Sequence, residues 1–382
     1  LKKKYSFTPI SNCDTEILLE GFSLEGKKFI EKIDGIYAFV MYNKVNGDFY
    51  VARDNLGIKP LLYSIVDKGI LISSDVNTLF EILEHPLPSN KSIIDLLSLT
   101  FVPEPNTLFD EIKYFKPGFL FHISNLGEFK SIEKIESSIK SKTYKKNETF
   151  EKSLDTLHKL MGKSVHDQLI ADSKVGLFLS SGIDSSLLLS ILVEMRYELF
   201  LAITLTYPSI AMGTDSQESE NLSSKLVSKI SELNHLEITP PLSLYNYDKI
   251  LNYLVIEGIS DPAALATFHL SNLAKKKGCK VMLAGQGADE LFFGYRRHKI
   301  VSVYKFLKKI PKINTSILEK LLSLIKIPSL YSKLRRFIKL LKLCGNSPKE
   351  ILLNLYTWVD SKTLNKLLVN CVDSTFLNEI EN

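Results

Sequence analysis

The sequence predicts an α/β protein of two domains, in which a β-rich domain precedes a doubly wound parallel sheet with a helical tail. Short strands separated by turn residues fill the first 130 residues. From residue 150 onward, apolar residues at helical spacing alternate with short apolar runs, which is typical of helices packed on a parallel sheet. A chain of 382 residues has room for two such domains, each with its own core.

Turns pair the expected strands of the first domain. Residues 46–47 (Asn-Gly) are a strong hairpin signal, and residues 67–69 separate a second pair of apolar runs. The segment 131–147 is polar and rich in lysine and serine. We therefore interpret it as a linker between a first domain over 1–130 and a second over 148–382. The strands themselves are expected at residues 39–41, 48–51, 61–66, 70–73 and 119–123.

The second domain alternates helices with strands. A helix over 150–169 carries its apolar residues on one face. Another, over 262–277, begins at Pro262, has lysines in its last turn and stops at Gly278. This alternation implies a doubly wound parallel sheet. Strands are expected at 175–179, 200–206, 235–239 and 280–284, further helices at 187–193 and 216–233, and short helices in the basic, apolar tail over 301–344.

The most informative segment is the loop that follows the strand at 175–179. Unpaired N–H groups and the positive end of the following helix favour an anion in such a loop. Gly182 lets the backbone approach a phosphate closely, and the serine hydroxyls add donors. An aspartate beside phosphates makes sense mainly with Mg²⁺ between them. The loop consists of Ser180, Ser181, Gly182, Ile183, Asp184, Ser185 and Ser186.

A second strand ends in a similar loop. The run 280–284 leads into a glycine-rich turn and then into Asp289 and Glu290 at the start of a helix. Two parallel strands that end in such loops converge at the carboxyl edge of a sheet. Asp184 and Asp289 would then share the metal that bridges the bound phosphates. The alternatives are a serine-rich turn in the first loop and charge stabilisation of a helix N-terminus in the second.

The first loop resembles the pyrophosphate-binding loop of the ATP-pyrophosphatase (PP-loop) enzymes. Together the two loops resemble the synthetase domain of the asparagine synthase family, glutamine-hydrolysing type. The family usually has glycine at the place of Ser181, which serine can fill if its φ stays negative. The resemblance covers roughly residues 8–298. Upstream segments resemble the later half of the family's glutaminase domain, a class II glutamine amidotransferase of the N-terminal nucleophile type: 34–39, 52–61, 73–75 and 103–118.

The resemblance implies ATP-dependent amidation of aspartate to asparagine with ammonia from glutamine. The reaction would pass through β-aspartyl-AMP and release AMP and pyrophosphate. The implied small-molecule substrates are aspartate, glutamine and ATP, and the implied metal is Mg²⁺. The chain would thus be a carbon–nitrogen ligase of asparagine biosynthesis in the cytoplasm, and a homodimer is compatible with the resemblance.

The resemblance also assigns individual residues. Asp184 and Asp289 are the expected catalytic residues and metal ligands. Asp14 matches the aspartate that holds the amino group of glutamine, and a helix N-cap is the alternative. Gln286 occupies the position at which asparagine-forming enzymes carry a glutamate linked to handling of the acyl-adenylate. The expected contacts to ATP and pyrophosphate are Phe178, Ser180, Ser181, Gly182, Ser185, Ser186, Leu205, Ala284 and Gly285.

Two alternative functions follow from positions at which the chain differs from the family pattern. Because the amide of Gln286 cannot take a proton, the chain could amidate another carboxylate, such as a sugar acid in surface-polysaccharide synthesis. The first residue is Leu1, and the resemblance predicts a fragment without the N-terminal nucleophile segment and the C-terminal end. A catalytically incomplete nucleotide-binding remnant is therefore the second alternative. Cys13 is internal, so we interpret it as an ordinary small residue rather than the nucleophile.

Composition argues against several other classes of protein. A net charge of +5 does not indicate a nucleic-acid partner, and no apolar run has the length of a membrane span. We interpret the basic tail as a helical subdomain with solvated lysines rather than a membrane-surface or RNA-binding helix. The four cysteines have no CxxC spacing, which fits a reducing cytoplasm and suggests neither a zinc site nor disulfides.

Overall fold

The computed structural model describes residues 8–11, 13–136, 149–206, 233–239 and 248–295, with scattered positions between 298 and 364. Within this described part, no helix combines the length and apolar character needed to cross a membrane. The chain divides into two compact units. Unit 1 comprises Leu1–Asn147, Leu244–Asp261 and Val359–Asn382, and unit 2 comprises Glu148–Ser243 and Pro262–Trp358.

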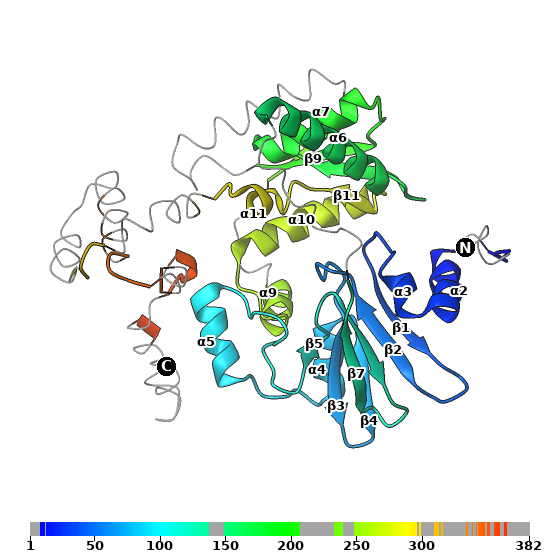
Figure 1. Ribbon diagram of the computed structural model, residues 1–382. Helices are drawn as coiled ribbons and strands as arrows, with labels where there is room; N and C mark the ends of the chain where they lie inside the picture. Colours follow the sequence, from blue (N-terminus) through cyan, green and yellow to red (C-terminus); the bar gives the residue numbers. More distant parts are fainter. Residues whose placement is uncertain are drawn as a thin grey trace. The chain divides into compact units, whose positions relative to one another are not determined.

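Two antiparallel sheets form the centre of unit 1 (Figure 1). The first has the order β1-β2-β6-β7 and the second the order β4-β3-β5. The strands are β1 (Ala38–Tyr42), β2 (Phe49–Arg53), β3 (Leu62–Val66), β4 (Gly69–Ser73), β5 (Lys113–Tyr114), β6 (Phe119–Ile123) and β7 (Phe129–Lys134). The helices are α2 (Asp14–Glu25), α3 (Lys27–Ile30), α4 (Val76–Ile82), α5 (Asn90–Leu99) and α9 (Asp248–Ile256).

Alternation of side chains along the strands builds the layers of unit 1. On β2, Tyr50 and Ala52 belong to a core cluster with Phe22 of α2 and Ile30 of α3. Val51, between them, points the other way into the cluster shared by the two sheets. This period of two is what a strand buried on both faces requires. Helices α2 and α3 therefore cover one face of the first sheet, and the second sheet covers its other face.

The second sheet is in turn covered by helices on its far face. Leu62 of β3 packs with Val76 and Leu79 of α4, and partly buried residues of α5 and α9 join the same cluster. Helix, sheet, sheet and helix thus follow one another as four layers. In this arrangement α9 belongs to unit 1, although the elements on either side of it in the sequence belong to unit 2.

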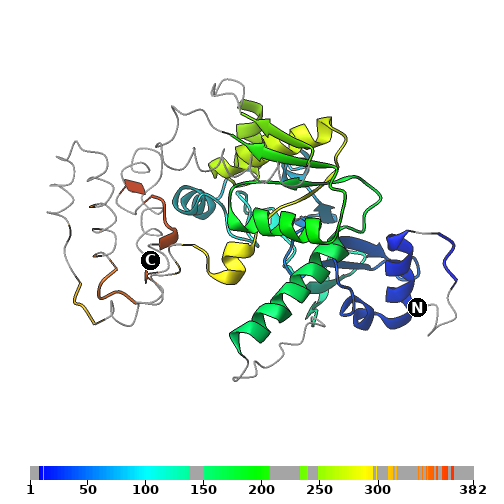
Figure 2. The same cartoon turned by 90° about the horizontal axis from the view of Figure 1, so that it is seen from above.

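Unit 2 contains a four-stranded parallel sheet of order β10-β9-β8-β11. Helices α6 and α7 share a core cluster with one face of this sheet. Residues of α10 pack on the other face, and Figures 1 and 2 show the two layers. The elements are α6 (Phe150–Gln168), β8 (Val175–Phe178), α7 (Ile183–Glu194), β9 (Leu201–Leu205), β10 (His235–Ile238), α10 (Pro262–Lys276), β11 (Val281–Leu283) and α11 (Ala288–Phe292).

The order of the strands creates a reversal between β8 and β11. From β8 the chain proceeds outward to β9 and then to β10, and it then returns to place β11 on the opposite side of β8. In an open parallel sheet, the loops at the carboxyl ends of two such strands leave the sheet in opposite directions, so a ligand crevice forms there. The two loops singled out in the sequence are the ones that follow β8 and β11.

The predicted fold class is confirmed, and most predicted elements lie within one or two residues of the observed ones. One expectation is wrong at its edge, because residues 131–134 of the expected linker continue β7 and pair with β6. The two compact units also differ from the expected intervals 1–130 and 148–382, since 244–261 joins unit 1. The helix expected over 216–233 and most of the helical tail after 301 lie outside the described residues.

Candidate functional sites

The loop after β8 is held by its own serines. The Ser185 hydroxyl, which is buried, accepts a hydrogen bond from the Ser180 amide at 3.0 Å and donates to the Ser180 carbonyl at 3.0 Å. The Ser180 hydroxyl accepts from the Gly182 amide at 3.1 Å. These two side chains therefore fix the shape of the loop. Ser181 has a negative φ, as its place in the loop requires of a serine.

The loop leads directly into α7. Gly182 is the N-cap residue of that helix, and Asp184 lies in its first turn. No side chain caps the first amides of α7, so these donors stay available to a ligand. In the described structure, the hydroxyls of Ser181 and Ser186 have no hydrogen-bond partner either. An anion at this loop would thus meet backbone and hydroxyl donors together with the positive end of a 12-residue helix.

The loop after β11 touches the loop after β8 at one glycine. A Cβ atom on Gly285 would lie 2.8 Å from Asp184 Cβ and 3.1 Å from the Ser185 amide nitrogen. Real Cβ atoms do not approach that closely, so only glycine allows this contact. The structure therefore brings together the two loops that the sequence analysis placed at one edge of the sheet.

Asp289 lies in the first turn of α11, four residues beyond Gly285. Its carboxylate rests against the backbone of Gly294, where an added Cβ would lie 1.8 Å from Asp289 Oδ1. Gly287 takes a left-handed conformation with φ of 93° and starts the helix. Glycines on both sides thus determine where this carboxylate lies. Its pairing with Asp184 over one metal stays a prediction.

The expected nucleotide contacts lie at the carboxyl ends of three neighbouring strands. Phe178 ends β8, and its partly buried ring packs against the core on the side of α10. Leu205 is the last residue of β9, and Ala284 follows β11. Gln286 is exposed between Gly285 and Gly287. These positions share one edge of the sheet with both loops.

The residues at this edge fit a magnesium ion that is shared with phosphates. In the described part of the chain, no group of three or more His, Cys, Asp or Glu side chains could hold a metal on its own. Mg²⁺ is commonly held by one or two carboxylates while substrate phosphates and water supply the rest. Two aspartates beside a glycine-lined loop match that mode of binding rather than a closed protein cage.

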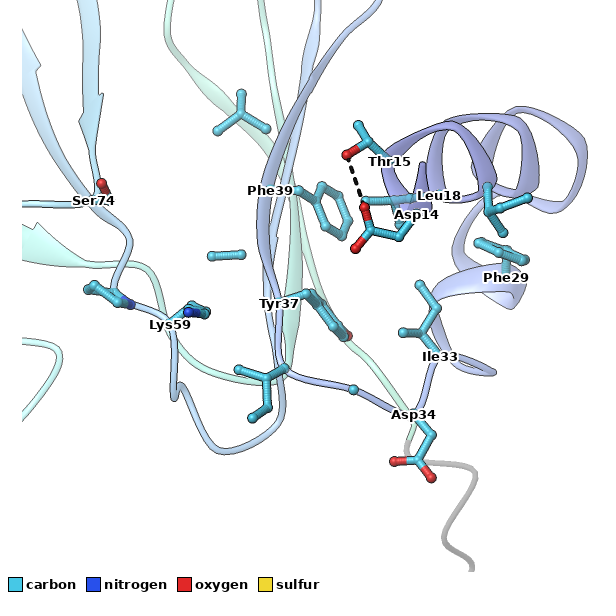
Figure 3. A pocket seen from close by; sticks show the side chains of 16 residues that line it. Asp14, Thr15, Leu18, Phe29, Ile33, Asp34, Tyr37, Phe39, Lys59 and Ser74 are labelled. Carbon is cyan, nitrogen blue, oxygen red and sulfur yellow. Dashed lines mark hydrogen bonds between the residues drawn. The ribbon is translucent and has the colours of Figure 1, made fainter. Parts of the chain in front are cut away.

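Asp14 lines a cavity in unit 1 that has a volume of about 970 Å³ (Figure 3). It is the first residue of α2, whereas Cys13 occupies the N-cap position, so the alternative N-cap role does not hold for Asp14. Asp34, Tyr37, Lys59 and Ser74 also line the cavity. Burial, with the charge of Asp54, raises the pKa of the Tyr37 hydroxyl, which keeps this group neutral in the wall.

Two buried charged residues shape one wall of this cavity. The guanidinium of Arg53, only 1% exposed, donates to the carbonyls of Gly57 at 2.8 Å and Lys59 at 2.9 Å. Asp54 accepts from the amides of Ile58 at 3.1 Å and Lys59 at 3.3 Å. Arg53 is itself paired with Glu104 at 3.0 Å. Sequence reasoning used this segment only for its resemblance and missed its positioning role.

Comparison with known proteins agrees with the two-part architecture. Residues 156–371 match the family model described as asparagine synthase, and residues 1–132 match the one described as glutamine amidotransferase domain. Fold and site together define a protein that combines an amidotransferase domain with a PP-loop-like domain. More specifically, the chain belongs to the asparagine synthase family.

Individual relatives carry the same family name. The glutamine-hydrolysing asparagine synthetase 1 of Bacillus subtilis (strain 168) is 29% identical over 81% of this chain and 47% of its own length. The glutamine-hydrolysing asparagine synthetase 2 of the same strain is 26% identical over 76% of this chain and 40% of its own length. The chain thus spans about half the length of the curated relatives it matches.

Similarity to solved structures is low. A glutamine-dependent NAD⁺ synthetase from Acinetobacter baumannii in complex with adenosine diphosphate aligns over 97% of this chain and 84% of its own. The sequence identity is 13% and the TM-score is 0.27, so nothing about this chain follows from the alignment.

Proposed function

We propose that this chain serves an ATP-dependent amidation of aspartate to asparagine in which glutamine supplies the ammonia. The observation that carries the proposal is the contact of Gly285 with Asp184 at the reversal between β8 and β11. Two loops of small residues meet there, one of them leading into a long helix with uncapped amides. The family membership of the chain supports the same reaction.

The chemistry needs an activated carboxylate. A carboxylate is a poor acyl donor, so transfer of AMP from ATP to the aspartate side chain supplies a leaving group and releases pyrophosphate. Ammonia then attacks the β-aspartyl-AMP carbonyl, forms the amide bond and expels AMP. Negative charge develops on the departing pyrophosphate, and preorganised N–H donors stabilise such charge without reorganisation.

Within this reaction, the described residues would have distinct roles. The amides at the start of α7 and the hydroxyls of Ser181 and Ser186 would bind the pyrophosphate, while Ser180 and Ser185 hold the loop in shape. Asp184 and Asp289 would hold Mg²⁺, which when bound supplies positive charge to the phosphates. The edge of β8, β9 and β11 would hold the adenosine through Phe178, Leu205, Ala284 and Gly285.

Unit 1 would supply the ammonia. The cavity around Asp14 is large enough for a glutamine side chain and its amino-acid head group. The Asp14 carboxylate would pair with the amino group of that glutamine, because a carboxylate accepts hydrogen bonds from a cation more strongly than from a neutral donor. We further propose that the enzyme acts in the cytoplasm.

Binding of ATP to the full chain, followed by calorimetry in the presence of Mg²⁺, tests the nucleotide site. Asp184→Asn should weaken binding by at least about tenfold, since it removes one negative ligand worth roughly 1.4 kcal/mol or more. Asp155→Asn is the matched control, because Asp155 is an exposed residue of α6 remote in sequence from both loops. Equal affinities for the two variants would contradict the proposed site.

Gln286 is the reason to consider a second class of carboxylate as the substrate that is amidated. Its exposed amide stands between the two glycines of the second loop and cannot exchange a proton with the acyl-adenylate. Exchange of labelled pyrophosphate into ATP should depend on aspartate if aspartate is the acceptor. Dependence on a uronic acid instead would favour a sugar acid, and nucleotide binding with exchange for neither would favour a nucleotide-binding remnant.

A further inference from the structure

Helix α9 reaches unit 1 from a stretch of chain that begins and ends in unit 2. It follows β10 and precedes α10, yet residues Leu244–Asp261 belong to the compact unit of the amidotransferase domain. Backbone bonds fix the end of this insertion: the Val102 amide donates to the Gly258 carbonyl at 3.0 Å, and the Ser260 amide donates to the Thr100 carbonyl at 2.8 Å. The insertion is thus joined to unit 1 by directed bonds.

The first side-chain contact of α9 leads to the cavity through Asp75. The Tyr253 hydroxyl donates to Asp75 Oδ1 at 2.9 Å. Asp75 Oδ2 accepts from the amide and the hydroxyl of Thr78, at 3.0 and 2.8 Å, and so caps α4. The residue before Asp75 is Ser74, which lines the cavity, so a shift of Asp75 would move this part of the wall.

The second contact leads to the cavity through Arg53. Glu257 accepts a hydrogen bond from Asn77 at 3.2 Å, and its charge acts, after burial, to raise the pKa of Tyr114. The Tyr114 ring lies 5.3 Å from the guanidinium carbon of Arg53. Arg53 in turn holds the carbonyl of Lys59, which lines the cavity on the same side as Ser74. Contacts therefore run from α9 to one wall both through Asp75 and through Arg53, and Glu257 also interacts with Asp75.

We propose that Tyr253 and Glu257 are positioning residues for the cavity around Asp14, so that docking of the α9 insertion sets the wall that faces glutamine. The proposal rests on the proposed function, because the ligand is taken to be glutamine. If the insertion holds the wall, glutamine binding and docking of α9 must favour each other by the same factor. A segment of the ATP-binding half of the chain would thereby control ammonia release in the other half.

Amide hydrogen exchange on the full chain, without any ligand, tests the positioning role. Tyr253→Phe removes only the hydroxyl that contacts Asp75, so exchange across residues 73–79 should become at least about threefold faster. Tyr42→Phe is the matched control, because it makes the same change on β1 at an exposed ring outside the cavity. Equal exchange in both variants would overturn the proposal.

Glutamine binding to the same proteins adds a readout that a merely structural role would not move. Tyr253→Phe should weaken glutamine binding about five- to tenfold relative to Tyr42→Phe, because a wall that is no longer held in place by α9 binds the ligand less well. Added glutamine should slow exchange in α9. An unchanged affinity in Tyr253→Phe would overturn the proposal.

The ligand of the cavity and the positioning role of α9 can be refuted separately. If the unmodified chain does not bind glutamine, the proposed ligand of the cavity is wrong, and the exchange across 73–79 still decides whether α9 positions the wall. If Tyr253→Phe does not fold, Glu257→Leu supplies the same test, since it keeps a side chain of similar size but removes the carboxyl group that bonds to Asn77. Exchange and affinity equal to those of the control would overturn the proposal there too.

Discussion

Replacing Glu257 by glutamine should change how the stability of unit 1 depends on pH. Burial, with the charge of Asp75, raises the pKa of Glu257 from its ordinary 4.5 to about 7. Burial also raises the pKa of Tyr253 to about 12, and it raises the pKa of Tyr114. Against the opposing effect of burial, hydrogen bonds from Thr78 and Tyr253 lower the pKa of Asp75. Of the groups that face one another here, only Glu257 therefore titrates between pH 5 and 8.

The sign of the effect follows from the protons bound in each state. Between pH 4.5 and about 7 the folded chain keeps the Glu257 proton, whereas the unfolded chain releases it. The stability contributed by the neutral carboxyl is thus fully present below pH 4.5 and is lost as the pH rises to about 7. Each unit of difference between the folded and unfolded pKa is worth about 1.36 kcal/mol of unfolding free energy, so this interval corresponds to about 3.4 kcal/mol. Because Glu257 is partly exposed, we expect solvent screening to reduce this contribution to about 2 kcal/mol.

Glutamine imitates the neutral carboxyl at every pH. Urea unfolding of the full chain at pH 5, 6, 7 and 8 should therefore show Glu257→Gln close to the unmodified chain at pH 5 and about 2 kcal/mol more stable at pH 8. Glu111→Gln is the matched control, because Glu111 is exposed and makes the same change in charge. A constant difference between Glu257→Gln and the unmodified chain across this range would refute the reasoning.

Three glycines give further predictions. Gly285→Ala should destabilise unit 2 by about 1–3 kcal/mol and weaken ATP binding in calorimetry, because the new Cβ meets Asp184 and backbone that cannot move away. Gly162→Ala should instead stabilise the protein by about 0.5–1 kcal/mol and so raise its thermal midpoint, because Gly162 lies within α6 and a new Cβ would approach Met195 Cε only to 3.8 Å. Gly294→Ala should displace Asp289 and lower the affinity for Mn²⁺, measured by electron paramagnetic resonance with ATP present. Its affinity for ATP should stay higher than that of Gly285→Ala, because the new Cβ disturbs only the loop that carries Asp289.

Much of the fold follows from local sequence signals. The turn over residues 43–47 and the alternating residues around it predict the hairpin of β1 and β2, because both depend on neighbours in the chain. The buried run of β8 and the small residues after it likewise predict strand, loop and helix. Parallel strands with such loops made it possible to expect one shared edge, which the contact of Gly285 with Asp184 bears out.

The remainder depends on contacts between distant residues. β7 is a half-exposed edge strand whose polar residues have the composition of a linker, so only its pairing with β6 identifies it. The guanidinium that lets Arg53 hold the wall is itself held by the Phe115 carbonyl and by Glu104, which lie 62 and 51 residues away in the sequence. The place of α9 in unit 1 depends on Asp75, 178 residues before Tyr253. No local pattern encodes these partners.

A crystal structure of the full chain with a non-hydrolysable ATP analogue and Mn²⁺ in place of Mg²⁺ tests the central claim most directly. Anomalous scattering locates the metal without reference to the protein. We predict Mn²⁺ at the carboxyl ends of β8 and β11, with oxygens of both Asp184 and Asp289 and of the phosphates at about 2.0–2.3 Å. Mn²⁺ that is bound elsewhere, or that contacts neither aspartate while the nucleotide is present, would contradict the account.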